Sequence, residues 1–410
     1  MAIVKPFVCV HPAENHFEEV AALPYDVYSR AEAKAAAAKR PYSFLNIDRP
    51  ETQFPDEQDM YADCVYEKAA SMLQKWQEDG ILKQEEEACY FIYSLTMDGR
   101  EQTGIVGCSS VDDYLNGVIR KHEFTLAEKE QDRIRHVDVC STQTGPIFLA
   151  YRHSEEIRSL IHQVKLTAPL FDFVSEDGVR HAGWKVAEPA VNEALEKAFQ
   201  EISRTYIADG HHRCASAAKV ALKRREENPG YTGKEEFNYF LSILFPDDEL
   251  KILPYNRVVK DLNGLTTQEF LEKTAEKFNV EKAAEAVNPS EKGTYGMYLD
   301  DQWYLLRQRP EFVQADSVEG LDVAYLQREL LTPVLGIKDP KKDCRIAFSG
   351  GIRGTGDLEK RCHTDMKVAF SLYPTSIQEL FAVADAERMM PPKSTWFEPK
   401  LRSGLFLHRF

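Results

Sequence analysis

Hydrophobic positions along the chain follow two periods, one typical of helices and one typical of strands. Residues 31–39 are rich in alanine, a strong helix former, and residues 60–79 place their apolar side chains at helical spacing. Two apolar runs, 89–96 and 102–109, flank the dipeptide Asp98-Gly99, which is common in hairpin turns. These patterns predict two helices followed by a pair of antiparallel strands.

The rest of the chain alternates between the same two patterns. Further helices are predicted over 120–135, 214–225, 267–278, 323–331 and 376–386. Further strands are predicted over 146–151, 205–208, 240–245, 252–260, 296–299, 303–306, 345–348 and 368–372. The sequence therefore predicts a mixed α/β (α+β) protein. We expect three domains: an N-terminal α/β domain over 1–118, a middle domain over 119–265, and a C-terminal α/β domain over 266–410.

Charge and composition exclude several classes of protein. The chain has 410 residues with 51 Lys and Arg against 66 Asp and Glu, which gives a formal charge of −15. This excess of acid argues against a surface that grips nucleic acid. No window approaches the ~18 apolar residues of a membrane span, and the first residues lack the apolar stretch of a secretory signal. We therefore expect a soluble, cytoplasmic protein without membrane or nucleic-acid partners.

Several common catalytic motifs are absent from the sequence. It contains no Gly-x-x-x-x-Gly-Lys-[Ser/Thr] loop, no Gly-x-Ser-x-Gly, no His-Glu-x-x-His and no protein-kinase motif set. Its eight cysteines form no Cys-x-x-Cys pair, so a zinc ribbon or finger is not expected.

The sharpest local signal is the run Asp209-Gly210-His211-His212-Arg213, which follows a short apolar strand and precedes a predicted helix. Backbone N–H groups at a helix start attract anions, and two imidazoles and a guanidinium add further donors for phosphate. The carboxylate of Asp209 could hold Mg²⁺ or orient a histidine. The alternative is an Asp-Gly turn with solvated basic residues. Two histidines and an arginine at one such turn favour a functional role.

A second signal is Lys121-His122-Glu123, followed by Glu128, Asp132 and Arg133. Taken alone, this stretch is more simply a charged helix face with pairs at i,i+4 spacing. Glu123 becomes interesting only where a reaction needs a base.

Two further segments could meet a ligand. Lys393, Ser394 and Thr395 follow Pro391-Pro392, which excludes helix and stiffens the backbone, so their side chains could bind an anion or a small polar substrate. An ordinary surface tail is the alternative. Asn256 and Arg257 lie at a probable strand end, where a ligand and plain solvent exposure are equal possibilities.

These residues resemble a known superfamily. Asp209-Gly210-His211-His212-Arg213 resembles the signature turn of the ParB/sulfiredoxin superfamily, most closely that of the free L-serine kinases. His122-Glu123 resembles the kinases' Pro-His-Glu, whose glutamate is taken as the catalytic base. The segment from Pro392 to Thr395 resembles their late Pro-Lys-Thr-Thr. The resemblance covers about residues 120–400, and the first 118 residues have no counterpart in the shorter serine kinases.

The whole chain also resembles a bacterial family labelled a domain of unknown function. That family shares Pro-Tyr-Asp-Val at 24–27, the turn at 209–213, Leu-Pro-Tyr-Asn-Arg at 253–257 and the ending at 390–400. Sulfiredoxin-like proteins use a cysteine where this chain has His211, so reduction of sulfinic acids is not expected. Neither the Arg-rich turn nor the DNA-binding helix-turn-helix of partition proteins is evident.

The resemblance implies a ParB/sulfiredoxin-like nucleotide-binding core over 119–265, with the end of the C-terminal domain returning to the active site. It implies transfer of a phosphoryl group from ADP or ATP to the hydroxyl of free L-serine, with Mg²⁺ as cofactor.

The resemblance also implies a role for each residue. Glu123 would be the general base. Asp209, His211 and His212 would be catalytic, with Asp209 also near Mg²⁺. The phosphates would be bound by Gly210, His211, His212, Arg213, Asn256 and Arg257, and the amino acid by Lys393, Ser394 and Thr395. A non-catalytic nucleotide-binding regulator and, less favoured, a partition-type nucleic-acid-binding module remain the alternatives. The sequence predicts neither the oligomeric state nor the choice between ADP and ATP.

Overall fold

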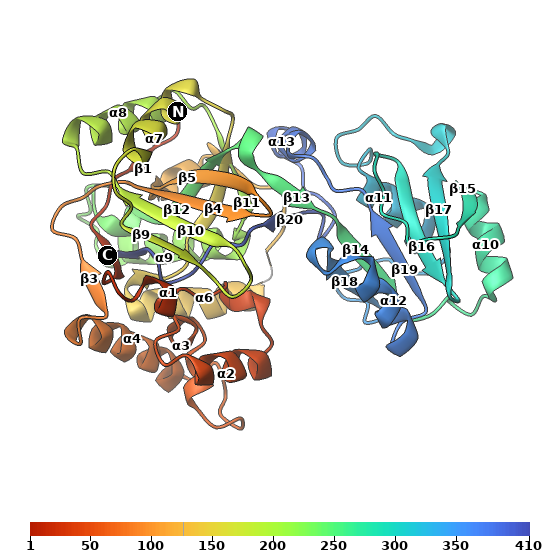
Figure 1. Ribbon diagram of the computed structural model, residues 1–410, viewed down its shortest axis with the longest axis horizontal. Helices are drawn as coiled ribbons and strands as arrows, with labels where there is room; N and C mark the ends of the chain where they lie inside the picture. Colours follow the sequence, from red (N-terminus) through yellow and green to blue (C-terminus); the bar gives the residue numbers. More distant parts are fainter. Residues whose placement is uncertain (126) are drawn as a thin grey trace. The chain divides into compact units, whose positions relative to one another are not determined.

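The structure is a computed structural model that describes residues 1–125 and 127–410 (Figure 1). Its contacts divide the chain into two compact units. Unit 1 comprises Met1–Lys121, Thr125–Leu250 and Pro399–Phe410, and unit 2 comprises His122–Phe124 and Lys251–Glu398. The chain is mixed α/β with several sheets, as the sequence predicts. The three expected domain ranges remain a prediction, although 1–118 and 119–265 both supply strands to one sheet of unit 1.

A nine-stranded sheet forms the centre of unit 1, in the order β6-β11-β8-β12-β5-β4-β10-β9, with β1 also paired to β5. Its strands are β1 (Val4–Lys5), β4 (Phe91–Met97), β5 (Arg100–Ser110), β6 (Ile119–Arg120), β8 (Ile147–Tyr151), β9 (Phe171–Val174), β10 (Arg180–Lys185), β11 (Thr205–Asp209) and β12 (Tyr239–Pro246). The pairs β6–β11 and β8–β12 are parallel, and the other pairs are antiparallel. All eight residues of β12 are buried, which is expected of an almost entirely apolar central strand.

The helices of unit 1 pack against this sheet or, on the N-terminal side, against one another and α6. They are α1 (Phe17–Val20), α2 (Arg30–Lys39), α3 (Leu45–Asp48), α4 (Asp63–Glu78), α5 (Val111–Leu115), α6 (Ala127–Cys140), α7 (Glu155–Lys165), α8 (Pro189–Gln200) and α9 (His211–Glu227). One core cluster joins sheet residues to the apolar faces of α7, α8 and α9. Helix α6 packs against both α4 and α9, so it links the N-terminal helices to the helix that follows β11.

The two ends of the chain meet in a four-stranded sheet of unit 1. Its order is β3-β2-β21-β7, with β2 (Cys9–Pro12), β3 (Leu82–Gln84), β7 (Thr142–Gln143) and β21 (Leu407–Arg409). Because β21 pairs with both β2 and β7, the last residues of the chain are held in unit 1.

Unit 2 contains a six-stranded antiparallel sheet in the order β15-β17-β16-β19-β14-β18 and a two-stranded sheet of β13 and β20. The strands are β13 (Lys251–Leu253), β14 (Tyr255–Val259), β15 (Phe278–Ala283), β16 (Thr294–Leu299), β17 (Gln302–Gln308), β18 (Ile346–Gly350), β19 (Val368–Leu372) and β20 (Trp396–Glu398). The helices are α10 (Thr267–Ala275), α11 (Asp322–Leu326), α12 (Gly354–Thr364) and α13 (Ile377–Asp385). A π-helical turn, Gln327–Leu331, continues α11.

Most of the predicted elements are confirmed, and two differ for clear reasons. Asp98 and Gly99 have φ angles of 54° and 75°, as a two-residue hairpin turn requires. The helix predicted over 120–135 is wrong at its start, because Ile119 and Arg120 pair with β11 and the helix begins only at Ala127. The single strand predicted over 252–260 is split at Pro254, which has no N–H for a ladder and whose carbonyl accepts the Gly351 N–H at 2.7 Å. Within the described residues, no helix is long and apolar enough to cross a membrane.

Candidate functional site

The predicted anion-binding turn is a strand, one left-handed residue and a helix. Strand β11 ends at Asp209, Gly210 has a φ of 95°, and the 17-residue helix α9 begins at His211. Glycine suits this position for two reasons. It adopts a positive φ without strain, and a Cβ here would lie 3.0 Å from Arg213 Nε. The helix starts three residues earlier than the sequence suggested, so His211, His212 and Arg213 form its first turn. The amides of a first turn have no acceptor within the helix.

Asp209 is an ion-pair partner of two cations. Its Oδ2 accepts a hydrogen bond from Lys400 Nζ at 3.1 Å, and its Oδ1 lies 3.9 Å from Arg213 Nη2. Burial by itself would raise the pKa of Asp209, but the charges of Lys400 and Arg213 lower the pKa well below its usual value. The carboxylate is therefore ionised at neutral pH. Sequence reasoning missed Lys400, although this residue closes the shared ending at 390–400.

Arg213 is held against its own turn rather than extended into solvent. Its Nη1 donates to the Pro146 carbonyl, and its guanidinium lies beside Gly145 and Gly210, which leave room for it. The side chain is 13% exposed. Arg213 thus links α9 to the loop before β8, and its predicted role as a phosphate clamp stays a prediction.

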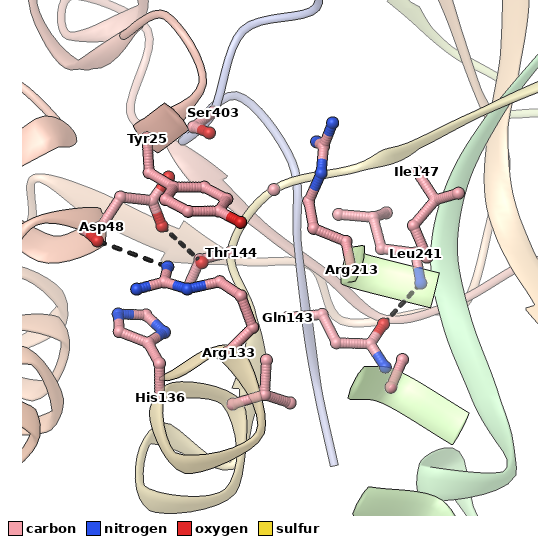
Figure 2. A pocket seen from close by; sticks show the side chains of 13 residues that line it. Tyr25, Asp48, Arg133, His136, Gln143, Thr144, Ile147, Arg213, Leu241 and Ser403 are labelled. Carbon is pink, nitrogen blue, oxygen red and sulfur yellow. Dashed lines mark hydrogen bonds between the residues drawn. The ribbon is translucent and has the colours of Figure 1, made fainter. Parts of the chain in front are cut away.

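A small cavity lies beside this turn (Figure 2). Its volume is about 30 Å³, which gives room for one or two water molecules. Arg213 lines it together with Tyr25, Arg133 and the fully buried His136. The Arg133 guanidinium stacks 4.1 Å from the centre of the Tyr25 ring, so the Pro-Tyr-Asp-Val segment forms part of the wall around the turn. The sequence indicates this segment only as one that the bacterial family shares.

The helices beside the turn are joined by polar contacts. Ser216 Oγ donates to the carbonyl of His212 at 2.7 Å and to that of Glu130 at 3.2 Å. Glu130 forms an ion pair with Lys219. Burial alone would raise the pKa of Glu130, but hydrogen bonds from Lys219 and Thr125 lower it. Helices α6 and α9 are therefore fixed to each other one turn after His212.

Glu123 lies in unit 2 and not on a helix. It belongs to the short connection between β6 and α6, and its side chain is half-buried. The interpretation of Lys121–Arg133 as one charged helix face is therefore wrong at Glu123. The neighbouring His122 carbonyl accepts the Met390 N–H at 2.8 Å, which joins the His-Glu segment to the residue that precedes Pro391. The His122-Glu123 signal and the Pro-Pro segment thus meet within unit 2.

Arg257 is a buried cation without a carboxylate partner among the described residues. It is 3% exposed, and its guanidinium donates to the carbonyls of Tyr255 and Pro392. Burial lowers the pKa of Arg257 to about 10, partly offset by Tyr255 and Tyr295. The adjacent Asn256 uses its Oδ1 to accept the Leu372 N–H at 3.1 Å, so it holds the sheet together at this point.

The Pro-Pro segment is held beside β14 in unit 2. Lys393 has a φ of 58°, is exposed, and places its Nζ 5.4 Å from the centre of the Tyr255 ring. Ser394 is buried and donates to the Pro391 carbonyl at 2.6 Å, while its own carbonyl accepts the Thr375 hydroxyl at 3.0 Å. Ser394 therefore shapes the loop, and Lys393 is the member that faces outward. Thr395 is half-buried.

The predicted site residues thus form two clusters, one in each unit. Unit 1 holds Asp209, Gly210, His211, His212 and Arg213, joined by Lys400. Unit 2 holds Glu123, Asn256, Arg257, Lys393, Ser394 and Thr395. Their assigned roles stay predictions.

The described residues contain no group of three or more His, Cys, Asp or Glu side chains that could hold a metal ion. Mg²⁺ is often bound by one or two carboxylates together with substrate phosphates and water. Asp209 can supply one such carboxylate, although Lys400 already occupies its Oδ2. A magnesium ion here would depend on ligands from the bound nucleotide.

Comparison with protein families shows to which family this chain belongs. It belongs to the family described as "Protein of unknown function (DUF1015)", whose family model matches residues 4–324. No curated protein matches the chain.

Several solved structures are similar at low identity. A mutant of free serine kinase in complex with ADP is 14% identical with a TM-score of 0.36, over 74% of this chain and 92% of the other. C-terminally truncated SbnI from Staphylococcus aureus is 12% identical with a TM-score of 0.38, over 73% and 85%. A conserved hypothetical protein from Pyrococcus furiosus is 14% identical with a TM-score of 0.34, over 74% and 95%. Likeness at this level carries no argument about function.

Proposed function

We propose that this protein is a kinase that transfers a phosphoryl group from ADP or ATP to the hydroxyl of free L-serine. The product would be O-phospho-L-serine, and the nucleotide-binding core would be ParB/sulfiredoxin-like. The observation that carries the proposal is the turn at Asp209, whose carboxylate pairs with Lys400 and Arg213 and which is followed at once by a helix start with two histidines. Helix amides and clustered cations are the groups that bind phosphate in proteins.

The unit 1 cluster is assigned to the phosphates of the nucleotide. The first-turn amides of α9 and the imidazoles of His211 and His212 would donate to phosphate oxygens, with Arg213 and Lys400 supplying positive charge. Asp209 would hold Mg²⁺ once the nucleotide brings further oxygen ligands, and the ion would neutralise charge on the transferred group. Asn256 and Arg257 remain proposed phosphate ligands.

Arg257 gives the proposal support from unit 2. Burying an unpaired charge costs considerable free energy, and proteins normally offset that cost with a counter-ion. The described residues supply two carbonyls and the face of the Phe348 ring, whose centre lies 5.4 Å from the guanidinium, but no carboxylate. An anionic ligand, either a phosphate or the carboxylate of an amino acid, would complete the pairing.

The proposed reaction needs a base and an acceptor. The serine hydroxyl oxygen would form a bond to the terminal phosphorus as the bond from that phosphorus to its bridging oxygen breaks. The nucleotide would leave with one phosphate fewer, and the hydroxyl proton would pass to the Glu123 carboxylate. Lys393 and Thr395 would bind the amino acid, with Ser394 shaping their loop.

The experiment that tests the proposal is incubation of the full chain with Mg²⁺, ADP or ATP, and each free amino acid in turn. Phosphoserine should appear by mass spectrometry only with L-serine, from at least one of the two nucleotides. Nucleotide binding without any phosphorylated amino acid would overturn the kinase and leave the nucleotide-binding regulator. Absence of nucleotide binding would overturn both.

A further inference from the structure

A second pocket lies in unit 1, between α6 and elements of the first 66 residues. It is lined by residues of α4, α6, the segment around Tyr25 and the 3₁₀ helix Pro50–Gln53, and its volume is about 190 Å³. It shares Tyr25 and Arg133 with the 30 Å³ cavity beside Arg213, but it is large enough for a small organic molecule. The proposed function assigns no role to this pocket.

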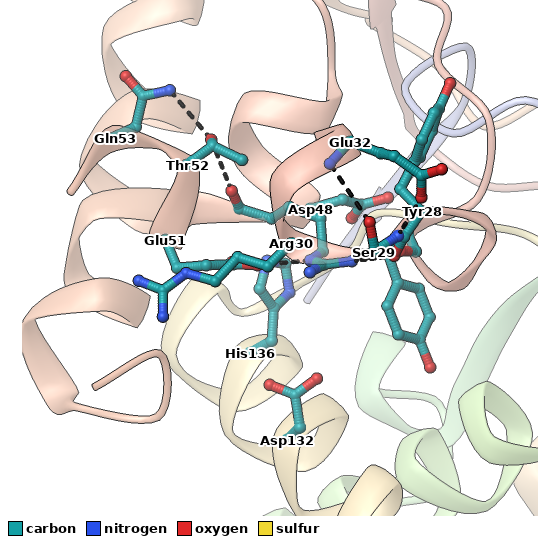
Figure 3. Close-up of polar contacts among 12 residues, drawn as sticks. Tyr28, Ser29, Arg30, Glu32, Asp48, Glu51, Thr52, Gln53, Asp132 and His136 are labelled. Carbon is teal, nitrogen blue, oxygen red and sulfur yellow. Dashed lines mark hydrogen bonds and ion pairs between the residues drawn. The ribbon is translucent and has the colours of Figure 1, made fainter. Parts of the chain in front are cut away.

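Two opposite charges are buried in its wall. Arg49 is 8% exposed and Glu51 is 3% exposed, and Arg49 Nε donates to Glu51 Oε1 at 2.5 Å. Arg49 Nη1 donates to the carbonyls of Tyr25 and Tyr28, each at 2.9 Å. Within the described part of the chain, Arg49 Nη2 and Glu51 Oε2 make no hydrogen bond to a protein atom. Figure 3 shows the polar contacts around Glu51 and Thr52, whose hydroxyl donates to the Arg49 carbonyl.

The rest of the wall combines aromatic and apolar side chains with Asp132, Arg133 and the exposed Asp26. Tyr66 donates to Asp132 Oδ1 at 2.9 Å, and Asp132 Oδ2 accepts from Arg133 at 2.8 Å. Tyr61 stands at the rim with 38% of its surface exposed. Because Tyr66, Asp132 and Arg133 hold one another, a ligand would not have to order these three side chains.

We propose that this pocket binds a small zwitterion of the α-amino-acid class. The ligand carboxylate would accept from Arg49 Nη2, and the ligand ammonium would donate to Glu51 Oε2 beside the Tyr61 ring. A simple anion would face the Glu51 carboxylate, and a simple cation would face the Arg49 guanidinium. Only a molecule with both charges satisfies both open atoms. This site does not rest on the proposed phosphoryl transfer.

The proposal is tested by isothermal titration calorimetry of the full chain with each of the common L-amino acids, without nucleotide. At least one should bind saturably. Its decarboxylated amine and its deaminated acid should each bind about tenfold more weakly or not at all, because each loses one hydrogen bond to a charged group. Failure of every amino acid to bind at millimolar concentration would overturn the site, and so would equal affinity for the amine or the acid.

Variants separate this pocket from any other binding site. Glu51→Gln should weaken binding about tenfold or more, whereas Glu67→Gln, an exposed change on α4 away from the pocket, should leave it unchanged. If Glu51→Gln does not fold, Tyr61→Ala at the exposed rim should weaken binding several-fold. Wild-type affinity in the folded variants would place the ligand elsewhere and overturn the proposal.

Discussion

At the scale of single residues, Asp209 and Arg213 already have structural contacts at the turn to which phosphate binding is proposed. Arg213 is held by the Pro146 carbonyl and lies against Gly210, and Asp209 is paired with Lys400. A role in phosphate binding would therefore add to contacts that already maintain the turn. Substitutions at this turn should differ in how far they change stability and ligand affinity.

His212 and Arg213 should separate these two effects. His212→Ala should weaken nucleotide affinity by the ~1.5–3 kcal/mol of a hydrogen bond to a charged group, with little change in thermal stability. Arg213→Ala should weaken affinity similarly and also lower the free energy of unfolding by ~1–3 kcal/mol, because the buried Pro146 carbonyl loses its donor. Calorimetric titration and denaturant unfolding measure the two quantities. Unchanged nucleotide affinity in both variants would remove the turn from the phosphate site.

Lys400 should stabilise the fold through Asp209. Lys400→Met should lower the free energy of unfolding by ~1–2 kcal/mol, between the values of exposed and buried pairs. Folding lowers the pKa of Asp209, so this stability is present above the unfolded pKa of about 3.9 and is lost as the pH falls through the folded value. The difference in the free energy of unfolding between wild type and Lys400→Met should therefore become smaller below about pH 4. Lys83→Met, an exposed change on β3, is the control, and a gap independent of pH would contradict this role.

Glu123 can be tested without changing its shape. If it is the base, Glu123→Gln should lower turnover by ~10²–10⁴-fold while nucleotide affinity stays near that of wild type. Glu128→Gln in the first turn of α6 makes the same change of charge on an exposed residue and should leave turnover intact. Steady-state kinetics decide the matter, and nearly full turnover in Glu123→Gln would exclude it as the base.

At the scale of elements, the proline-rich segment 390–395 is a loop in which some residues make internal contacts and one is exposed. Ser394 and the carbonyls of Pro391 and Pro392 make contacts inside unit 2, whereas Lys393 is exposed with a positive φ. The prolines restrict this backbone and reduce the entropy lost when the loop is held in place.

This division leads to opposite expectations for two neighbouring alanine substitutions. Lys393→Ala should raise the serine concentration needed for half-maximal rate more than the nucleotide concentration, with stability unchanged. Ser394→Ala should lower the free energy of unfolding by ~1 kcal/mol through the lost hydrogen bond. Kinetics with each substrate varied in turn, together with thermal unfolding, test this. Wild-type constants for serine in Lys393→Ala would end the proposed role of the loop.

The sequence predicted elements well wherever a local pattern decides the structure. The Asp98-Gly99 hairpin and strand β19 were located because turn chemistry and an apolar run are local features. The start of α6 was misplaced because pairing of Ile119 and Arg120 with β11, a contact distant in sequence, overrides local helix preference. Pro254 carries a local signal that splits the predicted strand, because a proline has no N–H for the ladder.

At the scale of the whole molecule, the missed parts of the candidate sites are those that depend on distant segments. Lys400 reaches Asp209 across 191 positions, and β21 holds the end of the chain in unit 1. Arg49 and Glu51 are near in sequence, but only the positions of Tyr25, α4 and α6 turn them into a pocket. Motif matching could flag Asp209 through Arg213, whereas no periodicity indicates which remote lysine will pair with them.

The net charge of −15 argues against a nucleic-acid-binding surface on this molecule. A nucleic-acid module would need a basic surface, whereas a kinase needs only a local cluster of donors. The central claim is that this cluster serves transfer of phosphate to a hydroxyl.

The most direct test of that claim is a ³¹P NMR time course of the full chain with Mg²⁺, nucleotide and L-serine. The terminal phosphate signal of ADP or ATP should decline as a phosphoserine signal grows at the same rate. O-methyl-L-serine, which lacks the acceptor hydroxyl, should give no new signal. A nucleotide signal that is unchanged by L-serine, or that declines equally with O-methyl-L-serine, would contradict the account.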